Sequence, residues 1–188
     1  MVSFTSLSVL LVSTLAAVQA APLNRRIVGT EKCTTVATGN LRTSKGVELG
    51  FVGSTLEFGG PLEVEFQSCT PNFGGYTGTD NTPIEGHIYI PSTGKCLTTN
   101  SATSASGPPF VFEQDDCYYS DDSGQFSSSF IKQSDGSIYY AGVTQADGSI
   151  IAWGDVCKSG YFGVLSTQTD GVATMSCVDN GDIIGLNI

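Results

Sequence analysis

The chain has 188 residues, a formal net charge of −10 and a charged fraction of only 14%. An acidic surface of this kind repels phosphate backbones and anionic lipid headgroups, which argues against nucleic-acid binding. Gly, Ser, Thr and Asp separate short apolar runs, and helical periodicity is hard to find after residue 27. The composition therefore predicts an all-β chain with many turns.

The N-terminal segment is predicted to be an export signal. The apolar run Leu7–Val18 is too short to span a membrane, and small residues at its end fit a signal-peptidase site. We expect residues 1–20 to be a signal peptide and the mature chain to be secreted, extracellular or in a cell wall, with no membrane span. Residues 21–26 end in Arg25-Arg26, which fits either a processed pro-segment or a solvated tail.

Residues 27–188 are predicted to form one domain, which begins with a lead-in strand over 27–38. Leu62–Phe66 alternates apolar residues with glutamates, which predicts a strand with its apolar side chains inward. The C-terminal run Ile183–Ile188 is predicted to be a closing strand beside the first. Other short strand-forming runs lie at Val47–Leu49, Thr55–Phe58, Gly86–Ile90, Lys95–Leu97 and Phe110–Phe112.

An internal repeat is suggested by three stretches that open with Gly-x-Ile/Leu and close on a cysteine after 30, 31 and 29 residues. They are Gly39–Cys69, Gly86–Cys117 and Gly148–Cys177. Such a pattern predicts one small unit of strands used three times around a shared core. The third frame is ambiguous, because Asp135–Ile138 and Asp147–Ile150 are twin hairpin signals. Counting back from the cysteine selects the second, and the first is then an insertion or the true start.

All six cysteines lie in the exported part, which favours disulfides, although the sequence alone allows fifteen pairings. The repeat favours pairing between neighbours, namely Cys33–Cys69, Cys96–Cys117 and Cys157–Cys177. A zinc site is not expected, because the chain has one histidine and no Cys-x-x-Cys. No metal or other cofactor is predicted.

The segment Gly94–Ile138 carries Gly-Lys-Cys-Leu, then an apolar strand into Cys117, then Asp-Gly-Ser-Ile. In these motifs the chain resembles the ricin B-type lectin family. The resemblance implies a β-trefoil, with three four-stranded repeats related by pseudo-threefold symmetry, and a bond between Cys96 and Cys117. Outside this segment only the Gly-x-Ile/Leu openings and the closing cysteines match.

The family's sugar-binding residues are largely replaced in this chain. Thr98 stands where the family has an Asp that binds sugar hydroxyls, and Asp115 stands where an aromatic ring stacks on the sugar. The family's Gln-x-Trp is replaced by Ser128-Ser129-Phe130, in which Phe130 can take the place of the core Trp. A sugar ligand would therefore have to use a site shifted from the usual position.

Catalysis is not predicted. His87 is the only histidine, so a Ser–His or Cys–His pair has one possible base, and this residue lies in an alternating strand. We expect His87 to be a satisfied or solvated strand residue.

The densest polar cluster is Asp115–Asp122, which contains four carboxylates and two tyrosines. It could bind a hard cation or sugar hydroxyls, although it lacks the ordered spacing of a calcium loop; a solvated acidic loop is the alternative. Trp153 is either a stacking platform or a core residue. The candidate ligand-binding residues are Asp115, Tyr118, Asp121 and Trp153.

The function predicted from the sequence is lectin-like carbohydrate binding by a secreted, non-catalytic protein whose partners are glycans or a secreted or surface protein. Two alternatives stay open. One is a protein-binding trefoil, such as a protease inhibitor or secreted effector, that uses the loops Pro71–Pro83 and Thr98–Pro109. The other is a structural cell-wall protein. The oligomeric state is not predicted.

Overall fold

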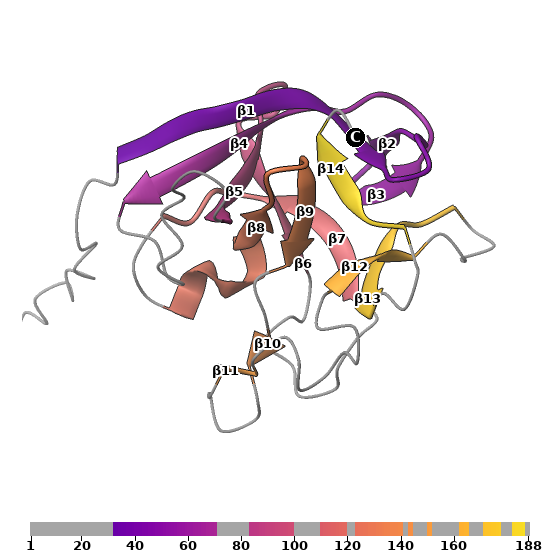
Figure 1. Cartoon of the computed structure of the whole chain (residues 1–188). Helices are drawn as coiled ribbons and strands as arrows, with labels where there is room; N and C mark the ends of the chain where they lie inside the picture. The colour runs from indigo at the N-terminus through magenta and orange to yellow at the C-terminus, as the bar shows by residue number, and fades with distance from the viewer. Residues whose placement is uncertain are drawn as a thin grey trace, which may run out of the picture.

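A computed structural model describes residues 32–70, 83–99, 110–119, 123–140, 143–144, 150–151, 162–165, 171–177 and 182–186 (Figure 1). These residues contain fourteen β-strands and one short 3-10 helix, so the predicted all-β class is confirmed. The elements are β1 Lys32–Thr43, β2 Leu49–Val52, β3 Thr55–Phe58, β4 Glu63–Thr70, β5 Ile84–Ile90, β6 Lys95–Thr99, β7 Phe110–Asp115, η1 Ser123–Ser128, β8 Phe130–Lys132, β9 Ser137–Tyr140, β10 Val143–Thr144, β11 Ile150–Ile151, β12 Phe162–Leu165, β13 Thr174–Cys177 and β14 Ile184–Leu186.

Six of the strands close into an antiparallel barrel. The order around the ring is β1, β4, β5, β8, β9 and β14, and β14 pairs back onto β1. In Figure 1 the long strand β1 runs across the top of the molecule with β4 below it. The predicted closing strand is confirmed, because Leu186 of β14 pairs with Leu41 of β1.

The remaining strands are additions to this barrel. Three hairpins, β2–β3, β6–β7 and β12–β13, pair internally and also touch one another, through β3 with β7 and β7 with β13. A bridge between Glu57 and Val172 joins β3 to the residues before β13. The short pair β10–β11 forms a separate two-stranded sheet.

The predicted fold class, a β-trefoil of three four-stranded repeats, is wrong. The structure is a closed six-stranded antiparallel β-barrel with extra strands, and the segment from β9 to β14 alone contributes six strands. The cysteines that suggested the repeat do not close equivalent units. Cys69 lies within the barrel strand β4, whereas Cys117 follows β7 and Cys177 ends the hairpin strand β13. Spacing along the chain does not fix which strand carries a cysteine.

The sequence left the frame of the third stretch open between two twin signals, and these lead into different parts of the structure. The earlier signal, Asp135–Ile138, is the one that opens a barrel strand, because β9 begins at Ser137 and pairs with β8 and β14. The later signal leads only into β11, which pairs with β10 outside the main sheet.

The core follows the alternation of the strands. In β4 the side chains of Val64 and Phe66 are fully buried, whereas Glu63 is exposed, as the sequence predicts. Phe130 is also fully buried, and its ring lies 6.5 Å from that of Phe112 and 5.9 Å from that of Tyr140. Its predicted role as a core residue is therefore confirmed, and such aromatic contacts stabilise a core beyond the area they bury.

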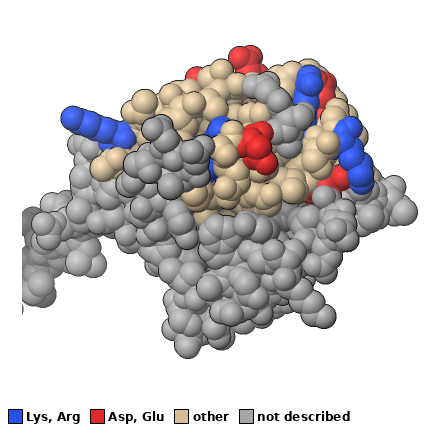
Figure 2. Space-filling view, in the orientation of Figure 1, with Lys and Arg blue, Asp and Glu red and all other residues tan. Residues whose placement is uncertain are grey.

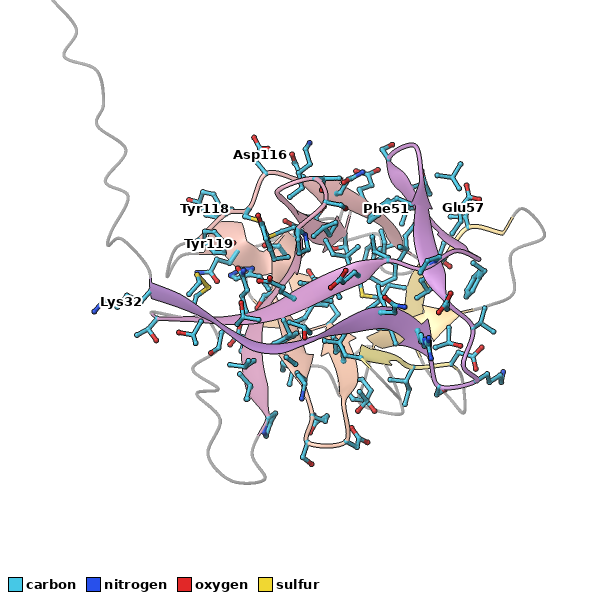
Figure 3. The ribbon with its side chains drawn as sticks, turned by 90° about the horizontal axis from the view of Figure 1, so that it is seen from above. Lys32, Phe51, Glu57, Asp116, Tyr118 and Tyr119 are labelled. Atoms are coloured by element: carbon cyan, nitrogen blue, oxygen red, sulfur yellow. A yellow bond between two sulfur atoms is a disulfide. The ribbon has the colours of Figure 1, made fainter. Side chains whose placement is uncertain are left out.

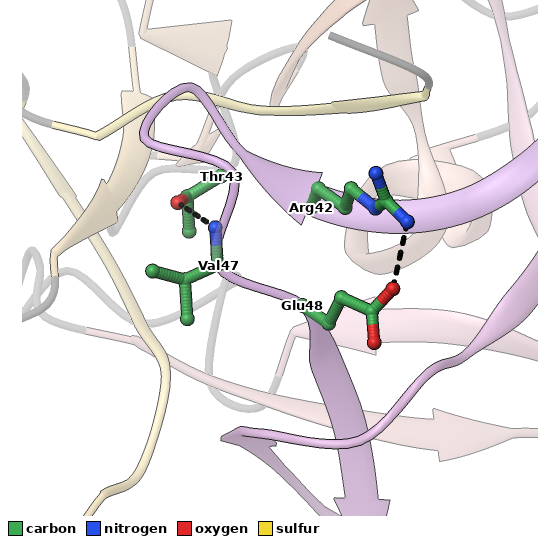
Figure 4. Close-up of polar contacts among 4 residues, drawn as sticks. All are labelled: Arg42, Thr43, Val47 and Glu48. Carbon is green, nitrogen blue, oxygen red and sulfur yellow. Dashed lines mark hydrogen bonds and ion pairs between the residues drawn. The ribbon is translucent and has the colours of Figure 1, made fainter.

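The turn from β1 into β2 is fixed by local polar contacts (Figure 4). The Val47 amide donates to the Thr43 hydroxyl at 3.3 Å, and the Arg42 guanidinium lies 2.7 Å from a Glu48 carboxylate oxygen. Gly46 adopts a φ of 79°, a backbone conformation that residues other than glycine rarely take. The ion pair is partly exposed to solvent, so it contributes only modestly to stability.

Two of the three predicted disulfides are present. Cys33 bonds to Cys69 across directly opposite residues of β1 and β4. Cys96 of β6 bonds to Cys117, which lies in the segment after β7. Cys157 falls outside the described residues, so Cys157–Cys177 remains a prediction.

Candidate functional site

The candidate site is the recognition loop, a name used here for Asp115–Tyr119, which begins at the last residue of β7. Asp115 and Asp116 are exposed, and Tyr118 and Tyr119 are half-buried. Figure 3 shows Asp116, Tyr118 and Tyr119 together on one side of the molecule. The Cys96–Cys117 disulfide ties the middle of the loop to β6, so its carboxylates and rings are presented from a fixed base.

A chain of hydrogen bonds attaches Tyr119 to the barrel. Its hydroxyl donates to the Gln67 side-chain oxygen on β4 at 3.0 Å. The Gln67 amide nitrogen in turn donates to Glu65 at 3.1 Å, and the same carboxylate oxygen accepts from the Thr35 hydroxyl on β1 at 2.8 Å. The Tyr119 hydroxyl also lies 3.8 Å from the sulfur of Cys96. The C-terminal end of the loop is thus fixed by a side chain as well as by a disulfide.

His87 lies directly behind Tyr119. Their ring centroids are 5.1 Å apart with an interplanar angle of 84°, and the imidazole is only 1% exposed. Nδ1 lies 3.0 Å from the backbone oxygen of Ser128, and a carbonyl can only accept, so Nδ1 carries the proton. Burial lowers the pKa of His87 below 6.5, and hydrogen bonds with Ser128 and Gln125 offset this only in part. His87 is therefore a satisfied strand residue, as predicted, and it is not placed to take a proton from a substrate in solvent.

Most of the positions that the sequence analysis compared with the lectin family's sugar site are buried. Thr98 is 9% exposed, and its hydroxyl donates to the backbone oxygen of Glu113 at 3.4 Å. Ser128 and Ser129 are each 2% exposed, and the Ser129 hydroxyl donates to the buried carboxylate of Glu85. Of these positions only Asp115 faces solvent.

Two of the four predicted ligand-binding residues lie within the described part of the chain. Asp115 and Tyr118 both lie in the recognition loop, so the structure brings these two together. Asp121 and Trp153 lie outside the described residues, as do most of the loops Pro71–Pro83 and Thr98–Pro109 proposed for protein binding.

Sequence reasoning missed the support of the loop. Glu65 and Gln67 share one face of β4 by simple alternation, which the sequence does signal. Their link to Tyr119 spans 52 residues, and no local pattern encodes it.

The charged side chains on the face seen in Figure 2 are of both signs and scattered among other residues. Within the described ranges, no three acidic, histidine or cysteine side chains come together as a metal site. The same ranges contain no helix with the length and apolar character needed to cross a lipid bilayer.

No protein-family model matches the chain, and a search of the curated proteins finds no match.

Proposed function

We propose that the chain is an exported, non-catalytic protein that binds carbohydrate through the recognition loop. The observation that carries this proposal is the loop itself, which combines the exposed carboxylates of Asp115 and Asp116 with the half-buried ring of Tyr118. Carboxylates accept hydrogen bonds from sugar hydroxyls, and an aromatic face packs against the apolar side of a pyranose ring.

Rigidity of the loop supports the same proposal. A loop that is ordered before binding loses less conformational entropy when the ligand arrives. The Cys96–Cys117 bond and the hydrogen bond from Tyr119 to Gln67 hold both the middle and the end of this loop. Polar ligands that make weak individual contacts gain affinity from such pre-ordering.

Export is supported by the disulfides. Two bonded pairs within one small domain are typical of oxidising compartments and are rare in the cytosol. The burial of His87 supports a non-catalytic role. The resemblance to ricin B-type lectins, based on Gly94–Ile138, stays part of the proposal, with a ligand site moved from the family's position to the recognition loop.

A glycan array probed with the exported chain tests the proposal. We expect saturable binding that weakens about fivefold or more in Tyr118→Ala, because stacking against one ring is worth roughly 1 kcal/mol or more. Asp115→Asn should weaken it as well, since the neutral amide loses the charge-assisted bond.

Two matched changes serve as controls. Tyr139→Ala removes another half-buried tyrosine, on β9, and Glu63→Gln neutralises an exposed carboxylate on β4. Both should leave binding unchanged. A complete lack of glycan binding, or equal losses in the test and control variants, would overturn the proposal.

A further inference from the structure

The imidazole of His87 is enclosed by two elements that follow it in the chain. The ring of Tyr119 covers it from the recognition loop, and η1 covers it through the Ser128 carbonyl and the Gln125 side chain. The covers differ in accessibility, since Gln125 and Ser128 are 1% and 2% exposed whereas Tyr119 is half-buried. Of these described residues around the imidazole, Tyr119 is the most exposed to water.

The surroundings of His87 are polar, and several of the neighbouring groups are hydrogen-bonded to one another. On β5 itself Glu85 accepts from Ser129, and on β4 Glu65 accepts from Thr35 and Gln67. The loop contributes the phenol of Tyr119, whose proton is given to Gln67. The lysines of β6 and β8 lie away from His87, because Lys95 pairs with Ile90 and Lys132 pairs with Ile84.

We propose that Tyr119 is the latch of the recognition loop and that protonation of His87 releases it, so that the loop is ordered near neutral pH and opens in acid. The release as such concerns the loop alone, whereas its meaning as ligand release rests on the proposed function.

The physical reason is the cost of a buried imidazolium. A neutral ring needs one acceptor, which Ser128 supplies, but a protonated ring carries a full charge in a buried place, and the hydrogen bonds with Ser128 and Gln125 offset that cost only in part. Moving Tyr119 aside admits water to the ring, at the cost of its hydrogen bond to Gln67, its contact with the Cys96 sulfur and the packing of the two rings. Moving η1 instead would expose groups that are almost fully buried.

The lowered pKa of His87 is consistent with a loop that opens as the pH falls. With the loop closed the ring resists protonation, and with the loop open it approaches its ordinary pKa of about 6.5. Between that value and the lower pKa of the closed state, the ratio of open to closed loop rises about tenfold for each unit that the pH falls. Below the lower pKa the ratio levels off.

Amide hydrogen exchange of the intact chain, corrected for intrinsic rates, measures the loop directly. From pH 7 to pH 4.5 we expect the amides of Asp116–Tyr119 to lose at least about tenfold in protection while those of β4 stay protected. In His87→Gln, which cannot be protonated but can still donate to Ser128, the loop should keep its protection across this range. Identical pH responses in the two proteins would overturn the inference.

The single histidine provides a second measurement that does not depend on a buried substitution. Its imidazole NMR signal should titrate with the same midpoint as the opening of the loop in the unaltered chain. In Tyr119→Phe, which loses the bond to Gln67 but keeps the ring, the loop should be less protected at pH 7 and the histidine pKa should move up toward 6.5. Separate midpoints, or an unshifted pKa, would contradict the latch.

The glycan array separates the two proposals. Loop opening in acid without glycan binding at any pH would sink the proposed function and leave the latch standing. Glycan binding that persists in acid, with a protected loop, would sink the latch alone.

Discussion

The Cys33–Cys69 and Cys96–Cys117 disulfides hold two regions of different character. The first joins directly opposite residues of β1 and β4, two strands already paired over eight rungs. The second joins β6 to Cys117, which lies beyond the last paired residue of β7. Cys33–Cys69 reinforces the paired strands β1 and β4, whereas Cys96–Cys117 fixes a segment that lies beyond the pairing of β6 with β7.

The two disulfides should therefore differ less in their effect on global stability than in their effect on the position of the recognition loop. On the chain-entropy model the two bonds stabilise the fold by similar amounts, because that contribution depends on the length of the closed loop and not on its surroundings. Only the second bond also holds a segment that lies beyond the strand pairing. We therefore expect similar losses of global stability on removing either bond but unequal effects on the recognition loop.

The largest effect is expected on the ladder side, in Gly86→Ala. A Cβ at Gly86 would lie 2.1 Å from the backbone oxygen of Gln67, which cannot move without breaking the pairing of β4 with β5. We expect a loss of more than about 4 kcal/mol in the free energy of unfolding, measured by urea denaturation.

Gly53→Asn is the control for that change. Gly53 has a φ of 63°, a backbone region that Asn tolerates, and a Cβ at this position would meet no other atom within 4 Å. Its cost should be about 1 kcal/mol or less. A Gly86→Ala protein as stable as this control would mean that the β4–β5 seam is looser than the structure shows.

The next largest effects are those of the paired cysteine variants. Replacing Cys33 and Cys69 by alanine should cost about 4 kcal/mol, and replacing Cys96 and Cys117 about 3 kcal/mol, from loops of 36 and 21 residues. Urea unfolding gives these values. Hydrogen exchange of Asp116–Tyr119 should be faster only in the variant that lacks Cys96 and Cys117. Equal exchange in the two variants would show that the two disulfides do not differ in their effect on the recognition loop.

A smaller effect is expected from pH, through His87, which lies where the two regions meet. Its folded pKa is lowered, so the unfolded chain binds the extra proton more readily. Stability is therefore complete above about pH 6.5 and falls with acid by at most about 1.4 kcal/mol per pH unit, until the folded pKa is passed. Stability curves of the parent chain and His87→Gln should diverge in this window, and parallel curves would contradict the assignment.

The sequence predicted much of what depends on neighbouring residues. The alternation in Leu62–Phe66 places Val64 and Phe66 in the core, and Asp135-Gly136 marks a true turn into β9. The overall architecture was predicted wrongly, because it depends on which strands pair across long separations. The near-equal spacings that end at Cys69 and Cys117 carry no such information, since these cysteines lie at different places in the fold.

The site shows the same limit. Asp115 and Tyr118 could be singled out from the density of polar residues around them. The importance of Tyr119 could not, because it arises from contacts with Gln67 and His87, which lie on other strands. The sequence left open whether His87 is satisfied or solvated, and both its burial and its contact with the loop required the packed structure.

The smallest effect on stability is expected at the turn before β9, which is held by hydrogen bonds and not by a disulfide. There Asp135 accepts hydrogen bonds from the backbone amide of Ser137 at 2.9 Å and from its hydroxyl at 2.5 Å. These bonds lower the pKa of Asp135, so the carboxylate stabilises the turn above its unfolded pKa of about 4 and loses that effect as acid protonates it. Asp135→Ala should cost about 1 kcal/mol at pH 7, whereas Asp135→Asn, which keeps an acceptor oxygen, should cost less and remove the acid dependence. Unfolding curves at pH 7 and pH 3 test both. Equal losses for the two variants would show that the turn depends on charge and not on the acceptor, in contrast to the neutral hydrogen bond by which Tyr119 holds the recognition loop.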